Sequence, residues 1–457
     1  MLARARQSKP VTDSAFVGLR SSLHGSLVLP DDDGYDEART VWNAAIDRRP
    51  AAIVRCADAS DVLRALEVAR TRGLPIAVRG GGHSFAGKAV CDDGLVVDCS
   101  PMKQVEVDCA RMVARAGAGC TLADFDAATQ AFGLATTMGT APPTGISGLT
   151  LGGGIGWLMG RFGLACDNLL AADVVTADGR VVRASAEEEP SLLWGLRGGG
   201  GNFGVVTALE YRLHPVTTVL GGAITYPASR AREVLRVYRD LTAGAPDELT
   251  TIMGILPLAT GPAFGVAVCW SGDIEAGERA VAPLRRLGAS LEDTIRPVAY
   301  LDVQSLLSPP PMRVGSYARS SFLDGLSDGA IDVLAARAEA PSPVLSIFFL
   351  EHLHGRASTF GLGDSAFSHR TPGHNFAALS MWLDPADAAT ATAQVRGFFD
   401  EMAPHLASGV YSNYLADEGD ARVRAAYGSA WQRLVGLKRQ YDPDNVFALN
   451  QNVDPRG

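Results

Sequence analysis

Several features that would assign this chain to a familiar class are missing from its sequence. The N-terminus, MLARARQSKPVTDSAF, is basic but lacks the apolar stretch of a signal peptide. We find no apolar run long enough to span a bilayer, so we expect no membrane contact and a cytoplasmic protein. Lys and Arg form no cluster, and the formal net charge is −9. This argues against nucleic acid as the main partner, because phosphate binding needs clustered positive charge.

Cysteine pairs and the common nucleotide motifs are also lacking. The 7 cysteines are scattered and none forms a C-x-x-C pair, which argues against a disulfide framework or a structural zinc. No G-x-x-x-x-G-K-[ST] is present. Residues 199–204 match G-x-G-x-x-G, but a helix-like segment precedes them and a strand, residues 205–213, follows. A Rossmann site needs the reverse order, so we reject that interpretation.

Three glycine-rich loops dominate what is present. They lie at residues 80–82, 152–154 and 198–201. Consecutive glycines reach positive φ and let backbone N–H groups converge on phosphate oxygens. One such loop can be a plain turn, whereas three together favour an anion the size of a dinucleotide. His83 directly follows the first loop; a histidine alone is more often structural, and this position favours a functional role.

The pattern of elements changes along the chain. Residues 51–78 are predicted to form strand, helix and strand, and they run straight into the first glycine loop. After Pro215 the alternation of β-like and helix-like runs predicts one antiparallel sheet with helices on a single face. Residues 309–311, three prolines, predict a stiff extended loop, and residues 421–441 predict one helix. The β-like runs after Pro215 are 220–226, 265–270, 344–350 and 376–382, and the helix-like runs are 230–241, 276–287, 330–338 and 386–402.

Longer motifs carry a resemblance to a known family. The segments PIAVRGGGHS, TGISGLTLGGGIGWLMGRFGLACDN, GGGGNFGVVT, YSNYLADEG and YDPDNVFALNQNVDP follow in this order. They resemble the vanillyl-alcohol-oxidase/p-cresol-methylhydroxylase (PCMH) flavoproteins, and among these the berberine-bridge-enzyme-like oxidases. The resemblance implies an α+β fold with a two-subdomain, PCMH-type FAD-binding domain in residues 1–214. Residues 215–408 would form the inserted substrate domain, an antiparallel sheet with helices on one face, and residues 409–457 would return to the FAD domain.

The resemblance also implies which residues hold the cofactor. The family's R-[GS]-G-G-H histidine is bonded to the flavin 8α-methyl carbon, and it matches His83. Many members add a thioether to a cysteine at the position of Ala141, so we expect no second bond here. Cys166 stands elsewhere in the motif and is interpreted as a packing residue. The pyrophosphate is expected on the glycine loops. Besides His83, the expected FAD-binding residues are Arg79, Gly80, Gly81, Gly82, Ser84, Gly145, Ser147, Gly148, Gly153, Gly154, Val206, Asn450 and Asn452.

The catalytic candidates come from the segment Tyr411-Ser412-Asn413-Tyr414, which resembles the family's Y-x-N-[YF] motif. The second tyrosine of that motif often serves as the base, so the resemblance makes Tyr414 the candidate and places Asn413 near the flavin ring. A free phenol titrates near ~10, so this role needs a lowered pKa or proton transfer concerted with hydride loss. A tyrosine that merely packs at the flavin edge is the alternative.

A further polar segment, Glu351-His352-Leu353-His354, places two histidines on one face of a β-like run. A metal site is one interpretation. No third ligand has supportive spacing, so we expect no metal. We interpret the segment as polar groups that face the substrate from the sheet covering the flavin.

Taken with the resemblance, these residues imply an FAD-dependent oxidase. A hydride would pass to FAD from a C–H next to an alcohol, amine or phenol, and O2 would be reduced to H2O2. A dehydrogenase with another acceptor and a flavin-carrying protein that sequesters a drug-like compound are the alternatives. Aromatic residues of the insertion favour a flat, partly apolar secondary metabolite as substrate, with an oligosaccharide second. The sequence leaves the oligomeric state open.

Overall fold

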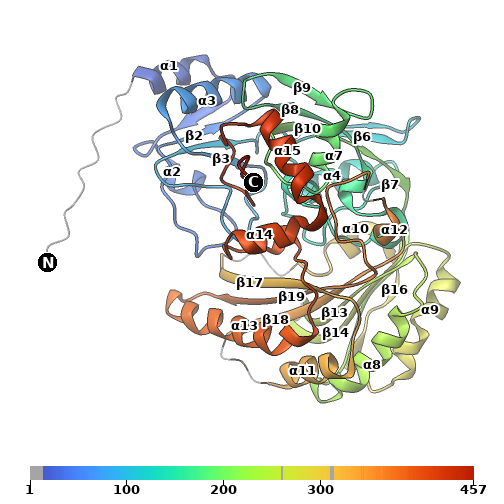
Figure 1. Cartoon of the computed structure of the whole chain (residues 1–457). Helices are drawn as coiled ribbons and strands as arrows, with labels where there is room; N and C mark the ends of the chain where they lie inside the picture. Colours follow the sequence, from blue (N-terminus) through green and yellow to red (C-terminus); the bar gives the residue numbers. More distant parts are fainter. Residues whose placement is uncertain (1–13, 259–260, 309–312, 341, 343, 362) are drawn as a thin grey trace, which may run out of the picture.

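Two halves lie one above the other in the computed structural model, which describes residues 14–457 apart from 259–260, 309–312, 341, 343 and 362 (Figure 1). The prolines at 309–311 lie outside the described residues. The upper half of the view contains the N-terminal strands together with the C-terminal helices α14 and α15. The lower half contains a large sheet with helices beneath it, so the first and last elements of the described chain share one half.

The first sheet of the upper half has the strand order β1-β2-β4-β3. Strands β2, β4 and β3 are parallel, and β1 is antiparallel to β2. Helix α3 (Ala59–Arg72) joins β2 to β3; it begins after Asp58, which caps it, and ends at Gly73 with φ 62°. The predicted strand–helix–strand unit is confirmed, and β3 leads into the first glycine loop. The strands are β1 (Ser26–Val28), β2 (Ala52–Arg55), β3 (Ile76–Arg79) and β4 (Leu95–Asp98).

The second sheet of the upper half is antiparallel, in the order β5-β6-β10-β8-β9. Helix α7 (Pro190–Leu196) precedes the third glycine loop and strand β10 (Val205–Arg212) follows it. This confirms the helix-then-strand order that argues against a Rossmann site. The other elements are α1 (Ser14–Ser22), α2 (Tyr35–Ala38), β5 (Val105–Asp108), β6 (Val113–Gly117), α4 (Leu122–Gln130), β7 (Leu134–Ala135), α5 (Ile146–Leu151), α6 (Met159–Phe162), β8 (Leu169–Val175), β9 (Val181–Ala184) and β11 (His214–Pro215).

The lower half is built on one antiparallel sheet in the order β15-β12-β14-β13-β18-β19-β17, with β16 beside β12. Helices α8, α9, α11 and α13 pack against one face of it (Figure 1). The predicted sheet with helices on one face is therefore confirmed, although β13 and β17 were not predicted. The elements are β12 (Thr218–Thr225), α8 (Ala231–Thr242), β13 (Leu249–Leu258), β14 (Gly261–Trp270), α9 (Ile274–Arg286), β15 (Glu292–Asp293), β16 (Arg296–Ala299), α10 (Tyr300–Gln304), β17 (Gly315–Leu323), α11 (Asp328–Glu339), β18 (Leu345–Leu353), α12 (Arg356–Thr359), β19 (Gly373–Trp382) and α13 (Ala388–Met402).

Strand β18 shows how the sheet separates its two faces. Phe348 and Leu350 join the core formed with the helices. Ile347 and Phe349, which alternate with them, pack instead with Phe85 of the upper half. Because successive side chains of a strand point to opposite faces, Glu351 shares the face of Phe349. The face without the large helices is thus turned toward the first glycine loop.

The C-terminal segment contains two helices where the sequence predicted one. Helix α14 (Asp420–Tyr427) and helix α15 (Trp431–Tyr441) are separated at Gly428, whose φ of 50° is unfavourable for other residues and ends the first helix. Leu434 and Phe447 belong to the same core as Val174 and Val205 of the second sheet. The segment thus completes the upper half, while the boundaries 214/215 and 408/409 stay predictions.

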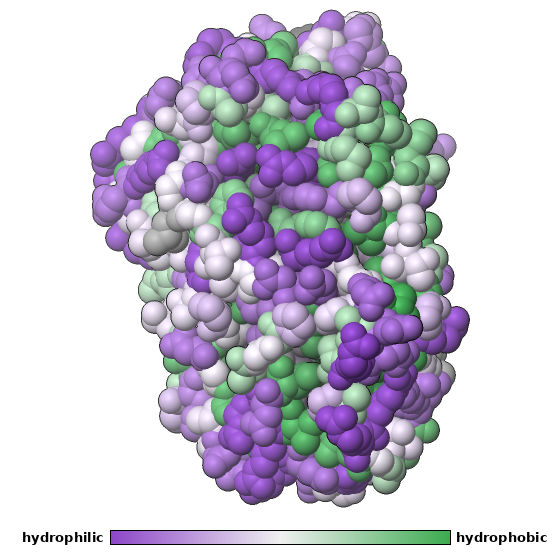
Figure 2. Space-filling model, turned by 90° about the vertical axis from the view of Figure 1, so that its right-hand side faces the viewer, coloured by the Kyte–Doolittle hydropathy of each residue, from purple (hydrophilic) through white to green (hydrophobic). Residues whose placement is uncertain are grey.

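On the face drawn in Figure 2, hydrophilic and hydrophobic residues are interspersed, and neither kind covers the whole face. Of the helices in the described part of the chain, none has both the length and the apolar character needed to cross a bilayer.

A buried lysine ties α15 to the third glycine loop. Lys438 is fully buried, and its Nζ donates to the carbonyls of Asn202 (2.9 Å) and Phe447 (3.0 Å) and to Asp442 (2.7 Å). Lys438→Met should lower the free energy of unfolding by about 3–5 kcal/mol, because it leaves the Asp442 charge buried and unpaired. Urea titration measures this. Lys103→Met breaks the exposed pair with Asp124 and should cost below about 1 kcal/mol; equal losses would contradict the role of burial.

Candidate functional site

The first and central glycine segments touch through their backbones. A Cβ added to Gly81 would lie 2.3 Å from the amide nitrogen of Gly145, and one added to Gly80 would lie 2.4 Å from Oγ of Ser147. Ser147 in turn donates to the carbonyl of Ala118 (2.9 Å). Only residues without side chains fit here, so glycine at these positions is required by packing and not only by turn geometry.

The third glycine loop continues the same region. The amide of Gly200 donates to the carbonyl of Leu151, at the end of α5 (2.8 Å). Asn450 donates to the carbonyl of Gly201 (3.2 Å), which brings the C-terminal tail to this loop. The first and third loops, the central segment 145–148 and the tail therefore form one continuous cradle, which we define as residues 79–84, 145–148, 198–202 and 450–452.

The cradle contains polar atoms that the protein itself does not satisfy. Nε of Arg79 and Oδ1 of Asn450 and Asn452 are buried without a hydrogen-bond partner. A Cβ on Gly148 or Gly201 would meet no atom within 4 Å. Buried polar groups normally have hydrogen-bond partners. These unpartnered donors and acceptors, beside glycines with open space next to them, therefore fit a bound ligand that carries phosphates and hydroxyls.

Gly153 and Gly154 of the central segment have backbone groups that bond within the protein. The Gly153 amide donates to Thr150, and the two carbonyls accept from Cys166 and Ala165. The Gly154 amide donates to the hydroxyl of Tyr411 (3.0 Å). Their backbone groups are thus paired within the protein. These glycines support the tyrosine segment, and their contact with FAD stays a prediction.

The remaining predicted residues lie around the cradle. Ser84 and Gly82 belong to the first loop, where Gly82 has φ 67°. Val206 is buried in β10, paired in register with Val174. Ala141 lies in the turn that leads into Gly145 and accepts from the amide of Thr144 (3.0 Å).

Cys166 packs beneath the central loop. It is fully buried, and burial raises the pKa of its thiol well above the usual value. Its neighbour Asp167 pairs with the buried Arg370 at 2.7 Å. The environment is that of a packing residue, as expected.

His83 stands at the end of the first loop against an aromatic ring. The indole of Trp42 stacks on its imidazole, with ring centroids 4.5 Å apart and planes 22° apart. Burial lowers the pKa of His83 to about 4. The imidazole is therefore neutral at pH 7, with a nitrogen lone pair available as a nucleophile.

Tyr414 meets a carboxyl group from the sheet. Its hydroxyl donates to Oε1 of Glu351 (3.0 Å), and Nδ2 of Asn375 donates to Oε2 (2.7 Å). Burial raises the pKa of Glu351 to about 7. Burial and the adjacent carboxylate also raise the pKa of Tyr414 well above its ordinary value. The phenol pKa is thus raised and not lowered, and the Tyr414 hydroxyl has Glu351 as its hydrogen-bond acceptor.

Asn413 holds segments together. Its Nδ2 donates to the carbonyl of Leu149 (2.9 Å) and to the hydroxyl of Tyr411 (2.8 Å). A Cβ on Gly152 would lie 2.0 Å from its Oδ1. Asn413 thus packs directly on the central loop and positions the tyrosine segment there.

The segment from Glu351 to His354 is divided between two faces. Glu351 meets Tyr414, whereas His352 lies on the helix-covered face with His374, at a centroid distance of 5.1 Å. The expectation that His352 faces the substrate is wrong, because strand alternation turns it away. His354 stacks on His352, with centroids 4.1 Å and planes 7° apart. Among the described residues, these three histidines do not bring their ring nitrogens together in the way a shared metal ion needs.

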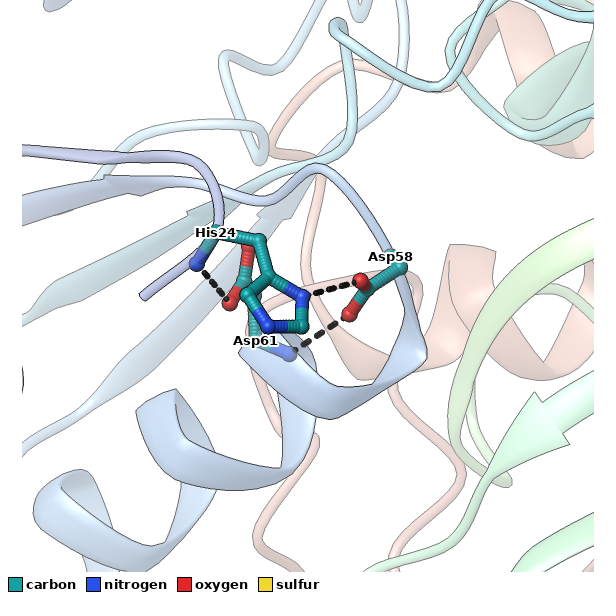
Figure 3. A group of neighbouring side chains, drawn as sticks. All are labelled: His24, Asp58 and Asp61. Atoms are coloured by element: carbon teal, nitrogen blue, oxygen red, sulfur yellow. Dashed lines mark hydrogen bonds and ion pairs between the residues drawn. The ribbon is translucent and has the colours of Figure 1, made fainter. Parts of the chain in front are cut away.

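One other group combines metal-ligand types within the described chain, namely His24, Asp58 and Asp61 (Figure 3). Asp61 already accepts from the amides of His24 (2.9 Å), Gly25 (2.8 Å) and Ala57 (2.9 Å). Asp58 caps α3 and pairs with the His24 ring at 2.7 Å. The group is explained as the cap of a helix.

The sequence alone does not reveal the residues that contact the candidates His83 and Tyr414. Glu351 was named only as one of several polar groups, and Trp42 and Asn375 were not named. The sequence spacing between Glu351 and Tyr414 follows no rule, so it does not predict their contact. The contact between Glu351 and Asn375 becomes visible only when β18 is paired with β19.

Comparisons with known proteins agree with this geometry. Residues 50–185 match the family model described as FAD binding domain, and residues 410–454 match that described as berberine and berberine like. The (R)-6-hydroxynicotine oxidase of Paenarthrobacter nicotinovorans is 33% identical over 95% of this chain and 98% of its own length. An FAD-linked oxidoreductase of Dictyostelium discoideum is 31% identical over 95% of both chains.

Solved structures give the same result. The crystal structure of 6-hydroxy-D-nicotine oxidase from Arthrobacter nicotinovorans superposes with a TM-score of 0.87 at 29% identity, over 95% of this chain and 98% of that chain. The cradle, the large sheet that faces it and these relatives define an FAD-linked oxidoreductase. The chain belongs to the berberine-bridge-enzyme-like branch of the PCMH-type FAD oxidases.

The contact between Gly81 and Gly145 gives a direct test of the cradle. Gly81→Ala places a methyl group 2.3 Å from a backbone nitrogen, so the two loops must separate and most of the bound flavin should be lost. The ratio of flavin absorbance to protein absorbance measures this. Gly397→Ala, on α13 with nothing within 4 Å, should keep its flavin; normal flavin content in Gly81→Ala would refute the packing argument.

Proposed function

We propose that this protein is an FAD-dependent oxidase that removes a hydride from a C–H next to an alcohol, amine or phenol group of a small molecule. The observation that carries the proposal is the array Tyr414–Glu351–Asn375 on the sheet face turned toward the first glycine loop. Phe85 of that loop packs edge-on against Tyr414, with centroids 5.7 Å apart. Ring contacts therefore connect His83 to Tyr414 through Trp42 and Phe85.

Bound FAD would supply the hydride acceptor and pass the electrons to O2, giving H2O2. The protein's part is to accept the proton. The Tyr414 hydroxyl can take a substrate proton while giving its own to Oε1 of Glu351, 3.0 Å away. A carboxyl with a pKa of about 7 is matched to proton transfer at neutral pH. Glu351 is thus the proposed final acceptor and Tyr414 the relay.

The surroundings of this pair favour a mostly apolar substrate. The sheet face near Phe85 presents Ile347, Phe349, Leu379 and Met381. Such a face excludes water and strengthens the electrostatic effect of the one buried carboxyl. Most of the aromatic residues noted in the insertion lie instead in the core with the helices, among them Tyr226, Trp270, Phe348 and Phe376. A small flat molecule with one polar group near Glu351 fits, and the relative named as an oxidase of (R)-6-hydroxynicotine supports this class.

His83 is the proposed covalent attachment point of FAD. Its place at the end of the cradle, its neutral ring and the family membership support this. With Ala141 in the second position, we propose a single bond.

The role of Glu351 is tested by its pH dependence. Below about pH 7 the Glu351 carboxyl is protonated and cannot accept a proton, so kcat/KM should rise with pH through about 7. Glu351→Gln should lose about 10²–10⁴-fold in kcat/KM and lose this rising limb. Oxygen uptake is followed with 6-hydroxynicotine, a benzylic alcohol, a phenol and a disaccharide.

Asp126 provides the matched control, because burial raises its pKa to about 7 as well while it pairs with Gln304. Asp126→Asn should keep the rising limb; if it removes the limb and Glu351→Gln does not, the assignment is refuted. Reduction of a dye without oxygen uptake would show a dehydrogenase, and binding without bleaching of the flavin would show a sequestering protein.

The covalent bond is tested by acid precipitation. Wild-type polypeptide should stay fluorescent after denaturation in acid, and His83→Ala should release all of its flavin to the supernatant. His369→Ala, which removes a half-buried histidine bonded to the α14 carbonyls, is the control and should stay fluorescent. Wild-type protein that releases its flavin would overturn the covalent attachment.

A further inference from the structure

Trp42 is the residue whose side chain stacks on the His83 ring. Among the described residues, the His83 imidazole has no hydrogen bond to another residue, and its own backbone is its hydrogen-bond partner. The Trp42 ring lies against it, 4.5 Å away and nearly parallel. The described contacts that bear on the ring are therefore the bond to its own backbone and the stacked face of the Trp42 indole.

The backbone of Trp42 is itself anchored from both sides. Its amide donates to the carbonyl of Gly82, in the first glycine loop (3.0 Å). The next residue, Asn43, donates through Nδ2 to the carbonyls of Phe85 and Ser316, both at 3.0 Å. Asn43 thereby connects the loop to strand β17. The indole is thus carried by a rigid backbone and not by a free surface loop.

We propose that Trp42 is a positioning residue for covalent attachment of FAD: its indole holds the His83 imidazole in the orientation in which a ring nitrogen meets the flavin 8α carbon. This inference rests on the proposed attachment through His83. Holding a nucleophile in a near-attack geometry accelerates bond formation without taking part in it.

The step balances as follows in atoms and electrons. A bond forms between a ring nitrogen of His83 and the 8α carbon of FAD. One hydrogen of the 8α methyl group and the N–H hydrogen of the imidazole leave as protons, and the two electrons from the broken C–H bond enter the flavin. O2 takes up both electrons and both protons as H2O2. The burial that keeps His83 neutral leaves the lone pair that forms the bond.

The test follows tethered flavin over time, so it does not depend on turnover. Protein produced under riboflavin limitation is incubated with excess FAD, and samples are precipitated in acid at intervals. Trp42→Ala should bind FAD but tether it at least about tenfold more slowly than wild type. Trp42→Phe, which keeps a flat ring, should restore most of the rate. Every substitution keeps the backbone N–H of residue 42, which donates the hydrogen bond to the Gly82 carbonyl. The experiment therefore tests the side-chain ring alone.

Trp270→Ala is the control for general destabilisation. Trp270 is 5% exposed and packs on the helix-covered face, with its Nε1 bonded to the carbonyl of Asp273. It should tether FAD at the wild-type rate once folded. If Trp42→Ala does not fold, Trp42→Leu decides the same question.

The outcomes separate the two proposals. Tethering by Trp42→Ala at the wild-type rate, with none in His83→Ala, would refute the role of Trp42 and leave the attachment intact. Loss of all bound FAD in Trp42→Ala would also refute it, because Trp42 would then serve binding. Absence of tethered flavin in the wild type would overturn the attachment itself.

Discussion

The structure depends on a contact between two backbones. Gly80 and Gly81 approach Gly145 and Ser147 so closely that a single methyl group would separate them. This contact joins the parallel sheet, which ends at β3, to the central glycine segment and α5. The third loop and the C-terminal tail then close the cradle through Leu151, Gly201 and Asn450. The glycines therefore have a packing role between the two sheets, in addition to any hydrogen bond that their amides donate to a ligand.

The second constraint is the alternation of β18. The observed register places Phe348 and Leu350 on the helix-covered face and directs Glu351 toward Tyr414. A shift of one residue would bury Glu351 among the helices and turn His352 toward the cradle. The hydrophobic pattern of the insertion thus fixes the position of its reactive carboxyl. Catalytic chemistry and core packing are set by the same alternation.

The features that the sequence predicts correctly are those that depend on local residue patterns. The strand–helix–strand unit, the helix-then-strand order at the third loop and the sheet with helices on one face follow from periodicity, caps and glycines. The sequence predicts a single helix where α14 and α15 lie, because Gly428 stands within an otherwise continuous helical pattern. Strands β13 and β17 were missed.

What the sequence could not give are contacts between distant segments. Glu351 and Tyr414 are separated by 63 positions, and Asn43 reaches Ser316 across 273. No spacing rule connects such residues, because the sheet register and the packing of the two halves decide the distance. For the same reason the internal bonding of Gly153 and Gly154 was not foreseen, since glycines in a loop look alike whether they contact a ligand or a tyrosine.

A crystal structure of the FAD-loaded protein tests the central claim most directly. The account predicts the pyrophosphate on the amides of the cradle, with the isoalloxazine ring between His83 and the Tyr414–Glu351 pair. A flavin ring turned away from that pair, or a pyrophosphate bound outside the cradle, would contradict it.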